Sequence, residues 1–305
     1  MSQPDPGTQD ADPPGADPPH AVSPDTGMPG TGLRGADGTV QLLADVERPA
    51  VWTLLIDGIL QSEVDLEDPW HLEIEYMRRL GHLIDLAAPA GVPLRVLHLG
   101  GGGLTLARYV AATRPGSRQL AVESNAVVAS LVSRRLPLDE PATGEVGVLV
   151  ADARAALEQL PAGSFDVLVV DVFAGPQTPA HLTSLEFTVA GARALAPSGI
   201  YAVNVGDGPP LAHARGRVAT VRSVFPHACV LAEPPVLDGR RFGNLVIAAS
   251  DRELPVSGLI RRTAADPFPA RLVDGAALDR FVAVCAPIMD AHAEPSPAMP
   301  PEVYA

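Results

Sequence analysis

The chain has 305 residues, of which 47% are hydrophobic, and its formal net charge is −14. This length allows one sizeable α/β domain with a smaller appendage, and the acidity argues against a nucleic-acid-binding protein, which needs a basic surface. All 22 basic residues are arginine, which excludes a Schiff-base lysine and the lysine of a P-loop. No apolar run has the length of a membrane helix and no signal-peptide pattern opens the chain, so we expect a cytoplasmic protein.

The two ends of the chain have the composition of disordered segments. Residues 1–36 and 293–305 are rich in Pro and small or polar residues and contain few large apolar ones. Such segments bury too little apolar surface to offset the entropy lost on ordering. We therefore predict a disordered tail at each end.

Residues 37–66 differ sharply from the tail that precedes them. The segments TVQLLADVE and AVWTLLIDGILQSEV alternate between apolar and polar residues. This pattern predicts two or three strands, with turns at Glu47–Pro49 and at Asp57–Gly58. A small N-terminal β unit is thus expected before the main domain.

The main domain is predicted to cover residues 67–292. An apolar repeat of three and four residues predicts a first helix over 69–88. Expected strands then cover 95–99, 118–123, 146–151, 166–171, 199–205, 228–232 and 244–250. Expected helices cover 104–113, 125–135, 153–160, 184–196, 210–224 and 275–290. Alternating strands and helices predict a seven-stranded, mostly parallel Rossmann-like sheet with helices on both faces and a final antiparallel strand.

A glycine turn follows the first strand of this sheet, in VLHLGGGGLTLARYV at 96–110. A dinucleotide fingerprint, GxGxxG, would need a third glycine where Thr105 or Leu106 stands, depending on the register. The turn therefore matches neither that fingerprint nor a P-loop, and a ligand without phosphate groups is favoured.

Three acids stand at the carboxyl ends of successive strands, where an α/β sheet binds its ligand. Glu123 ends the second strand and can accept both hydroxyls of a ribose, as in nicotinamide-binding and S-adenosyl-binding folds alike. Asp152 follows the third strand, where an S-adenosyl-binding fold places an acid against the adenine amino group. Asp171 ends the fourth strand and faces the reacting end of the ligand. Together with the glycine turn, these acids predict a sheet of the S-adenosylmethionine-dependent methyltransferase type.

Several segments resemble the spermidine synthase (polyamine aminopropyltransferase) family, in particular its divergent bacterial members. The resemblance covers roughly residues 38–250. It rests on LLIDGILQSE at 54–63, VLHLGGG at 96–102, AVE at 121–123, ADAR at 151–154 and FDVLVVDVF followed by PAHLTSLEF at 165–187, together with the helix around Tyr76. The strand-DG-strand-Gln hairpin before the sheet is typical of this family and rare in ordinary methyltransferases.

The resemblance implies transfer of an aminopropyl group from decarboxylated S-adenosylmethionine to an amine, with methylthioadenosine as the second product. Asp171 matches the position that orients the amine and takes its proton. The resemblance also implies a homodimer. The other residues implied at the site are Gln61, Gly100, Gly101, Gly102, Glu123, Asp152 and Ala153 for the nucleoside-bearing co-substrate and Tyr76 for the acceptor amine, with His181 as a further candidate substrate contact.

The sequence departs from the family pattern at carboxylate positions. Gly103 stands where the family motif GGGDGG has its aspartate, and Ala174 replaces the second aspartate of DxxD. Met77 and Arg78 follow Tyr76, where a carboxylate is usual. Either nearby acids replace these groups, or the substrate differs from a diamine. The candidates for replacement are Glu73, Glu75 and the acids between Asp65 and Asp68.

These departures keep two alternatives open: an S-adenosylmethionine-dependent methyltransferase and a catalytically inactive nucleoside-binding homologue. No two histidines have the spacing of metal ligands, so no metal is expected. His98 either contacts the ligand or packs the strand end. Asn204, Asp207 and Gly208 form either a turn or a wall of the pocket.

Overall fold

The computed structural model describes residues 1, 30–35, 38–138 and 144–300. Most of the predicted N-terminal tail, and residues 301–305 of the C-terminal one, therefore lie outside the described residues. The first unit in the described part of the chain is an antiparallel sheet of four strands in the order β1-β2-β3-β4. Their bounds are β1 Gly30–Gly35, β2 Gly38–Ala44, β3 Val51–Ile56 and β4 Ile59–Asp65.

This sheet begins earlier than the sequence predicts. Strand β1, GTGLRG, lies within the segment assigned to the N-terminal tail and pairs with β2. Its glycines give it a weak strand propensity, but pairing with a neighbouring strand can override local preference. The β unit thus has four strands rather than two or three.

The main sheet has eight strands in the order β12-β10-β11-β9-β8-β5-β6-β7. Their bounds are β5 Arg95–Leu99, β6 Ser117–Glu123, β7 Gly144–Val150, β8 Phe165–Val170, β9 Leu195–Asp207, β10 His227–Ala232, β11 Gly243–Ser250 and β12 Arg271–Val273. Strands β5 to β9 pair in parallel, and β11 runs antiparallel to both β9 and β10. All seven predicted strands are present and the Rossmann-like class is confirmed. The additional strand β12 has three residues, too few for a recognisable periodicity.

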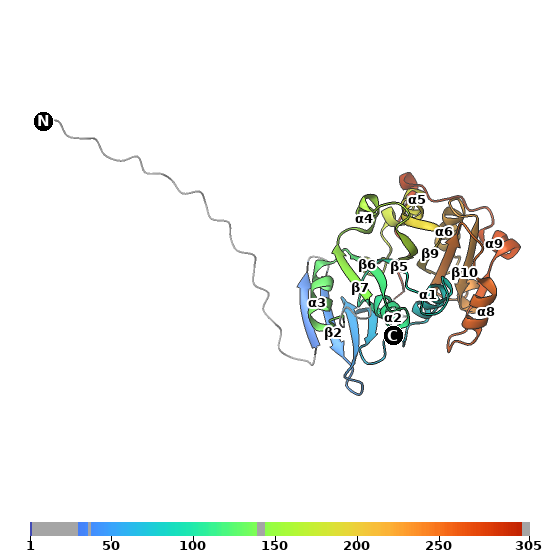
Figure 1. Ribbon diagram of the computed structural model, residues 1–305. Helices are drawn as coiled ribbons and strands as arrows, with labels where there is room; N and C mark the ends of the chain where they lie inside the picture. Colours follow the sequence, from blue (N-terminus) through green and yellow to red (C-terminus); the bar gives the residue numbers. More distant parts are fainter. Residues whose placement is uncertain (2–29, 36–37, 139–143, 301–305) are drawn as a thin grey trace.

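Nine α-helices connect and cover the strands of the described chain (Figure 1). They are α1 Glu75–Leu86, α2 Thr105–Thr113, α3 Ala126–Arg135, α4 Ala153–Gln159, α5 Leu185–Ala194, α6 Ala212–Arg222, α7 Pro234–Leu237, α8 Val256–Ala264 and α9 Gly275–Val282. Helix α1 begins six residues later than predicted, and α9 ends at Val282 because Ala283 takes a φ of 52°. The short α7 and the helix α8 were not predicted.

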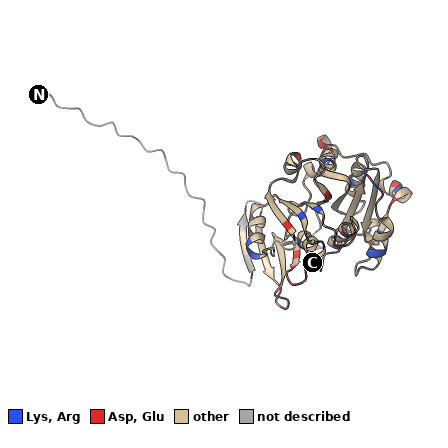
Figure 2. Cartoon of the chain, in the orientation of Figure 1, with Lys and Arg blue, Asp and Glu red and all other residues tan. Residues whose placement is uncertain are grey.

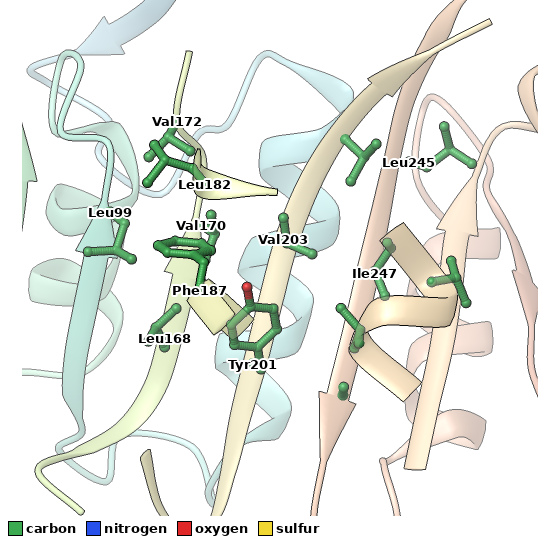
Figure 3. Close-up of a cluster of buried hydrophobic side chains, with 14 of the residues drawn as sticks. Leu99, Leu168, Val170, Val172, Leu182, Phe187, Tyr201, Val203, Leu245 and Ile247 are labelled. Atoms are coloured by element: carbon green, nitrogen blue, oxygen red, sulfur yellow. The ribbon is translucent and has the colours of Figure 1, made fainter. Parts of the chain in front are cut away.

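The core lies on both faces of the sheet. Helices α4, α5, α6 and α9 pack on one face, and α1, α2 and α8 pack on the other. Figure 3 shows side chains of the first face, in which Leu168, Val170, Tyr201 and Val203 of the central strands point toward Phe187 of α5 and its neighbours. Alternate residues of the same strands, such as Val167 and Val169, are buried on the second face. Burial on both faces explains the continuous apolar runs of these strands.

The N-terminal sheet packs against α2 and α3, at the edge of the main sheet that carries β6 and β7 (Figure 1). Leu54 and Val64 of the β3–β4 hairpin share an apolar cluster with Leu104, at the start of α2, and with Val128 and Leu131 of α3. This packing brings the β3–β4 hairpin against the glycine turn after β5.

The described part of the C-terminal tail lies against the loop after β8. Ser296 is 1% exposed, its amide donates to the Thr178 carbonyl at 3.0 Å, and its Oγ accepts from the Thr178 amide at 2.8 Å. Gln177 Nε2 also donates to the Ser296 carbonyl, at 2.6 Å. Composition predicts disorder for 293–305, but Ser296 has hydrogen-bond partners in a distant loop that composition does not reveal.

Candidate active site

A pocket opens at the carboxyl ends of β5, β6 and β8, with the β3–β4 hairpin as its outer wall. The structure brings together all of the predicted site residues except one. Those that line the pocket are Gln61, Tyr76, Gly100, Gly101, Gly102, Glu123, Asp152, Ala153 and Asp171. His181 is not among the lining residues.

The glycine turn lies directly over the end of β8. Gly100 has a φ of +92°, and a Cβ atom there would stand 1.9 Å from the Asp171 carbonyl oxygen. The Asp171 amide donates to the Leu99 carbonyl at 2.8 Å. Only glycine fits at position 100, and its absent side chain lets the turn approach the backbone of Asp171.

Glu123 holds the other side of the same turn. Its Oε2 accepts from the amides of Gly101 and Gly102 at 3.1 and 3.0 Å, and its Oε1 accepts from the Asn125 amide at 2.8 Å. The carboxylate is thereby fixed at the rim of the pocket, at the end of β6.

Asp152 caps α4 at the neighbouring strand end. Its Oδ1 accepts from the amides of Arg154 and Ala155, both at 3.0 Å, and its Oδ2 lies 2.7 Å from Nε2 of His181. Burial acts to raise the pKa of Asp152, but the hydrogen bonds from His181 and the two amides outweigh it and lower the pKa. His181 therefore contacts a pocket acid from outside the pocket.

The pocket also contains a carboxylate, that of Asp171, which two side chains hold by hydrogen bonds. The Tyr76 hydroxyl donates to Asp171 Oδ2 at 3.1 Å, and the Asn204 amide nitrogen donates to Asp171 Oδ1 at 2.9 Å. Burial raises the pKa of Asp171, against the opposing effect of these two hydrogen bonds. Burial and the adjacent negative charge raise the pKa of Tyr76 well above 10, so this hydroxyl stays protonated.

Asn204 is the second residue that holds Asp171. From the sequence alone it could belong either to a turn or to the wall of the pocket. It lies in β9, next to β8, with 3% of its surface exposed, and holds Asp171 from below the pocket floor. Asp207, weighed with it, caps α6 through the Ala214 amide and does not reach the pocket. The pattern of apolar and polar residues along β9 does not show which of Asn204 and Asp207 contacts a pocket residue and which contacts α6.

A β-bulge shapes the wall formed by the hairpin. Leu54 pairs with Ser62 but Leu55 pairs with Leu60, so Gln61 is an extra residue in β4. Neighbouring residues of a regular strand point to opposite faces, whereas the bulge lets Gln61 and Ser62 both line the pocket. Ser62 was missed because strict alternation places it behind Gln61.

Ser62 and Val64 also explain why position 103 carries no side chain. The Gly103 amide donates to Ser62 Oγ at 3.0 Å, and a Cβ atom on Gly103 would stand 2.7 Å from Val64 Cγ2. The hairpin occupies the space into which a side chain would grow. An acid at this position would therefore collide with β4.

His98 lines the pocket beneath the glycine turn. Its Nε2 is 2.9 Å from Gln119 Oε1, and Gln119 in turn donates its amide nitrogen to the Ala107 carbonyl. Burial lowers the pKa of His98 to about 4, against the effect of the bond to Gln119. The imidazole is therefore neutral near pH 7.

The acids considered as replacements lie away from the pocket. Glu73 is exposed and pairs with His71 at 2.7 Å, and Glu75 accepts from the Asn244 side chain at 3.2 Å. Asp65 and Asp68 accept from backbone amides of their own loop. None of these four carboxylates lines the pocket in the described chain. Figure 2 shows acidic and basic residues interspersed over the visible elements.

Within the described ranges, no group of three or more His, Cys, Asp or Glu side chains is placed to hold a metal ion. Over the same residues, no helix is long and apolar enough to cross a membrane.

Comparison with known proteins places this geometry in a family, although no protein-family model matches the chain. The chain is 34% identical to a probable spermidine synthase from Corynebacterium glutamicum, with a TM-score of 0.78 over 85% of this chain and 95% of that one. Spermidine synthase from Thermotoga maritima shares the fold, with a TM-score of 0.56, 17% identity and 83% of each chain covered.

Among curated proteins, the polyamine aminopropyltransferase of Chromobacterium violaceum is 31% identical over 146 residues. That match spans 48% of this chain and 54% of the relative, so the chain spans about half the length of the curated relative it matches. The match to the C. glutamicum protein, by contrast, extends over nearly that whole chain. The chain therefore belongs to the spermidine synthase family.

Proposed function

We propose that this protein is an aminopropyltransferase that uses decarboxylated S-adenosylmethionine and a small amine in polyamine biosynthesis. The observation that carries the proposal is Asp171, whose carboxylate is held by Tyr76 and Asn204 at the floor of the pocket. Membership of the spermidine synthase family supports it. The homodimer and the cytoplasmic location stay predictions from the sequence.

The proposed reaction is a displacement at carbon. The lone pair of the amine nitrogen forms a bond to the methylene beside the sulfonium sulfur. The carbon–sulfur bond breaks, its electron pair goes to sulfur, and methylthioadenosine leaves as a neutral thioether. The proton lost by the amine goes to Asp171 and then to solvent. The reaction needs an uncharged amine that is aligned with the methylene carbon. A carboxylate at hydrogen-bond distance can accept the proton of the amine and orient its nitrogen.

The other lining residues would bind the nucleoside. Glu123 stands at the end of β6, where a carboxylate can accept from ribose hydroxyls, and Asp152 and Ala153 stand at the start of α4 for the adenine. Gln61 reaches the pocket from the hairpin bulge, and the backbone of Gly100, Gly101 and Gly102 allows close approach of the ligand. The carboxylate of Asp152 already has a hydrogen bond with His181. Both side chains would therefore shift when adenine binds to Asp152.

The test is the release of methylthioadenosine by the purified protein from decarboxylated S-adenosylmethionine in the presence of amines, measured by chromatography. The Asp171→Asn variant should lower kcat by about 100-fold or more, the range of a general base, while its affinity for methylthioadenosine is retained. Unchanged turnover in this variant would refute the role of Asp171.

Methyl transfer from intact S-adenosylmethionine is a second candidate, favoured by Gly103. No side chain at this position can select the aminopropyl ammonium, because β4 fills the space. Calorimetric titration with both ligands separates the candidates. Tighter binding of the intact ligand, together with methylation of an amine or thiol, would replace the first proposal.

A further inference from the structure

A polar pair, His98 of β5 and Gln119 of β6, is buried in the face of the main sheet that carries α1 and α2. His98 is 4% exposed and Gln119 is 5% exposed. The residues that pair with His98 in the two neighbouring strands, Ala121 and Val169, are apolar and buried. Burying polar side chains costs free energy, and two aliphatic residues would serve a packing role alone. The pair therefore calls for another explanation.

The hydrogen bonds of this pair show which nitrogen of His98 carries the proton. Gln119 Nε2 donates to the Ala107 carbonyl at 2.9 Å, so Gln119 Oε1 is the atom that faces His98. Because an amide oxygen only accepts, His98 Nε2, 2.9 Å away, is the protonated nitrogen. Burial lowers the pKa of the imidazole to about 4. At neutral pH, Nδ1 is therefore an unprotonated acceptor.

This acceptor nitrogen borders the pocket. His98 is one of the lining residues, and its Nδ1 has no hydrogen-bond partner among the described residues. Nδ1 is also not among the described atoms without a partner that are fully buried, whereas Asn204 Oδ1 is. The imidazole thus offers a lone pair to a ligand in the pocket.

The charges around Nδ1 suit a cationic ligand. The described side chains that line the pocket include the carboxylates of Glu123, Asp152 and Asp171 and no arginine. Asp171 follows Val169 by two residues, and Val169 is the neighbour of His98 in the parallel pairing of β5 with β8. Two residues of a strand span about 7 Å. The lone pair of Nδ1 and the charge of Asp171 therefore lie in the same part of the pocket.

We propose that His98 binds the three-carbon arm of decarboxylated S-adenosylmethionine, with Nδ1 accepting a hydrogen bond from the ammonium of that arm. This inference rests on the proposed aminopropyl transfer. The ammonium is separated by only two carbons from the methylene that the amine attacks, so it lies near Asp171. Asp171 supplies the negative charge, and His98 supplies an acceptor atom that Gly103 cannot. The imidazole has to be neutral, because a protonated ring would repel both the ammonium and the sulfonium.

Two ligands that differ in this arm test the contact. Methylthioadenosine has the nucleoside and the sulfur but neither the ammonium nor the sulfonium charge. The double variant His98→Leu with Gln119→Leu replaces the polar pair by apolar side chains and leaves neither partner unpaired. In calorimetric titrations, its affinity for decarboxylated S-adenosylmethionine should fall by at least about tenfold, while its affinity for methylthioadenosine stays within about twofold of wild type.

Gln119→Leu alone is the matched comparison, because it makes the same change at position 119 but keeps the imidazole. It should weaken binding of decarboxylated S-adenosylmethionine by about threefold or less. Equal weakening in the single and the double variant would overturn the contact with Nδ1, because the change at position 119 would then account for it. Wild-type affinity in the double variant would overturn it as well.

A measurement on the wild-type protein does not depend on how the variants fold. Nitrogen NMR of protein labelled at histidine should show His98 with a protonated Nε2 and an unprotonated Nδ1. Decarboxylated S-adenosylmethionine should shift the Nδ1 resonance much more than methylthioadenosine does. A protonated Nδ1 in the free protein, or equal shifts with the two ligands, would overturn the role of His98 but leave aminopropyl transfer standing. Failure of both ligands to bind would refute the proposed function together with this inference.

Discussion

The proposed catalytic role of Asp171 comes with a cost to the stability of the fold. Because burial raises its pKa in the folded state, the folded protein binds this proton more tightly than the unfolded chain does. The contribution of Asp171 to the free energy of unfolding therefore falls as pH rises from its ordinary value through the raised one. Above both values the charged carboxylate destabilises the fold.

The Asp171→Asn variant should accordingly be more stable than wild type at pH 7, although it loses turnover. The difference between the two proteins should shrink as pH is lowered toward 4. Urea unfolding at several pH values measures it. A variant less stable than wild type at pH 7 would show that Asn cannot keep the bonds from Tyr76 and Asn204.

Tyr76 should act on the reaction through Asp171. Tyr76→Phe removes a donor to the carboxylate, so the pKa of Asp171 should rise further and kcat should fall by about tenfold. The proposed reaction needs the deprotonated carboxylate, so the acid limb of the pH profile should move to higher pH. Tyr109→Phe is the matched control, because that hydroxyl donates to Asp85 away from the pocket. An unmoved acid limb in Tyr76→Phe would contradict the coupling.

At the scale of elements, alanine substitutions at two glycines test how closely the glycine turn approaches the end of β8. The measured quantity is the loss in the free energy of unfolding. Gly91 has a φ of +74° with nothing within 4 Å, whereas Gly100 has a φ of +92° and faces the Asp171 carbonyl. Gly91→Ala should cost about 1–2 kcal/mol, the penalty of left-handed backbone alone. Gly100→Ala should cost about 4 kcal/mol or more, because the backbone must move. Equal losses in urea unfolding would contradict the contact.

The same scale shows what the sequence could and could not predict. Glu123, Asp152 and Asp171 were placed together because parallel strands end at one edge of the sheet. The bulge at Gln61 could not be predicted, since an inserted residue leaves the apolar alternation on either side intact. Strand β12 and the contact of Ser296 with the loop after β8 depend on distant backbone partners that no local pattern encodes.

For the whole molecule, residues of two sheets line the pocket, so a ligand bound there would contact both sheets. A ligand that binds only the folded state at 100 times its dissociation constant adds about 2.7 kcal/mol to the free energy of unfolding. For a domain of this size the melting temperature should rise by about 5–10 °C. Methylthioadenosine is the probe, and Glu123→Gln should reduce the rise. No change with wild type would argue against nucleoside binding.

Ligand binding in the shared pocket would also link the lifetime of the protein to the supply of that ligand. Proteases in the cell cut chains that open transiently, and the hairpin wall must separate from the glycine turn for the N-terminal sheet to open. A nucleoside bound as proposed would span that junction and keep it closed. The abundance of the protein should therefore follow the supply of its own substrate, with no dedicated regulator required.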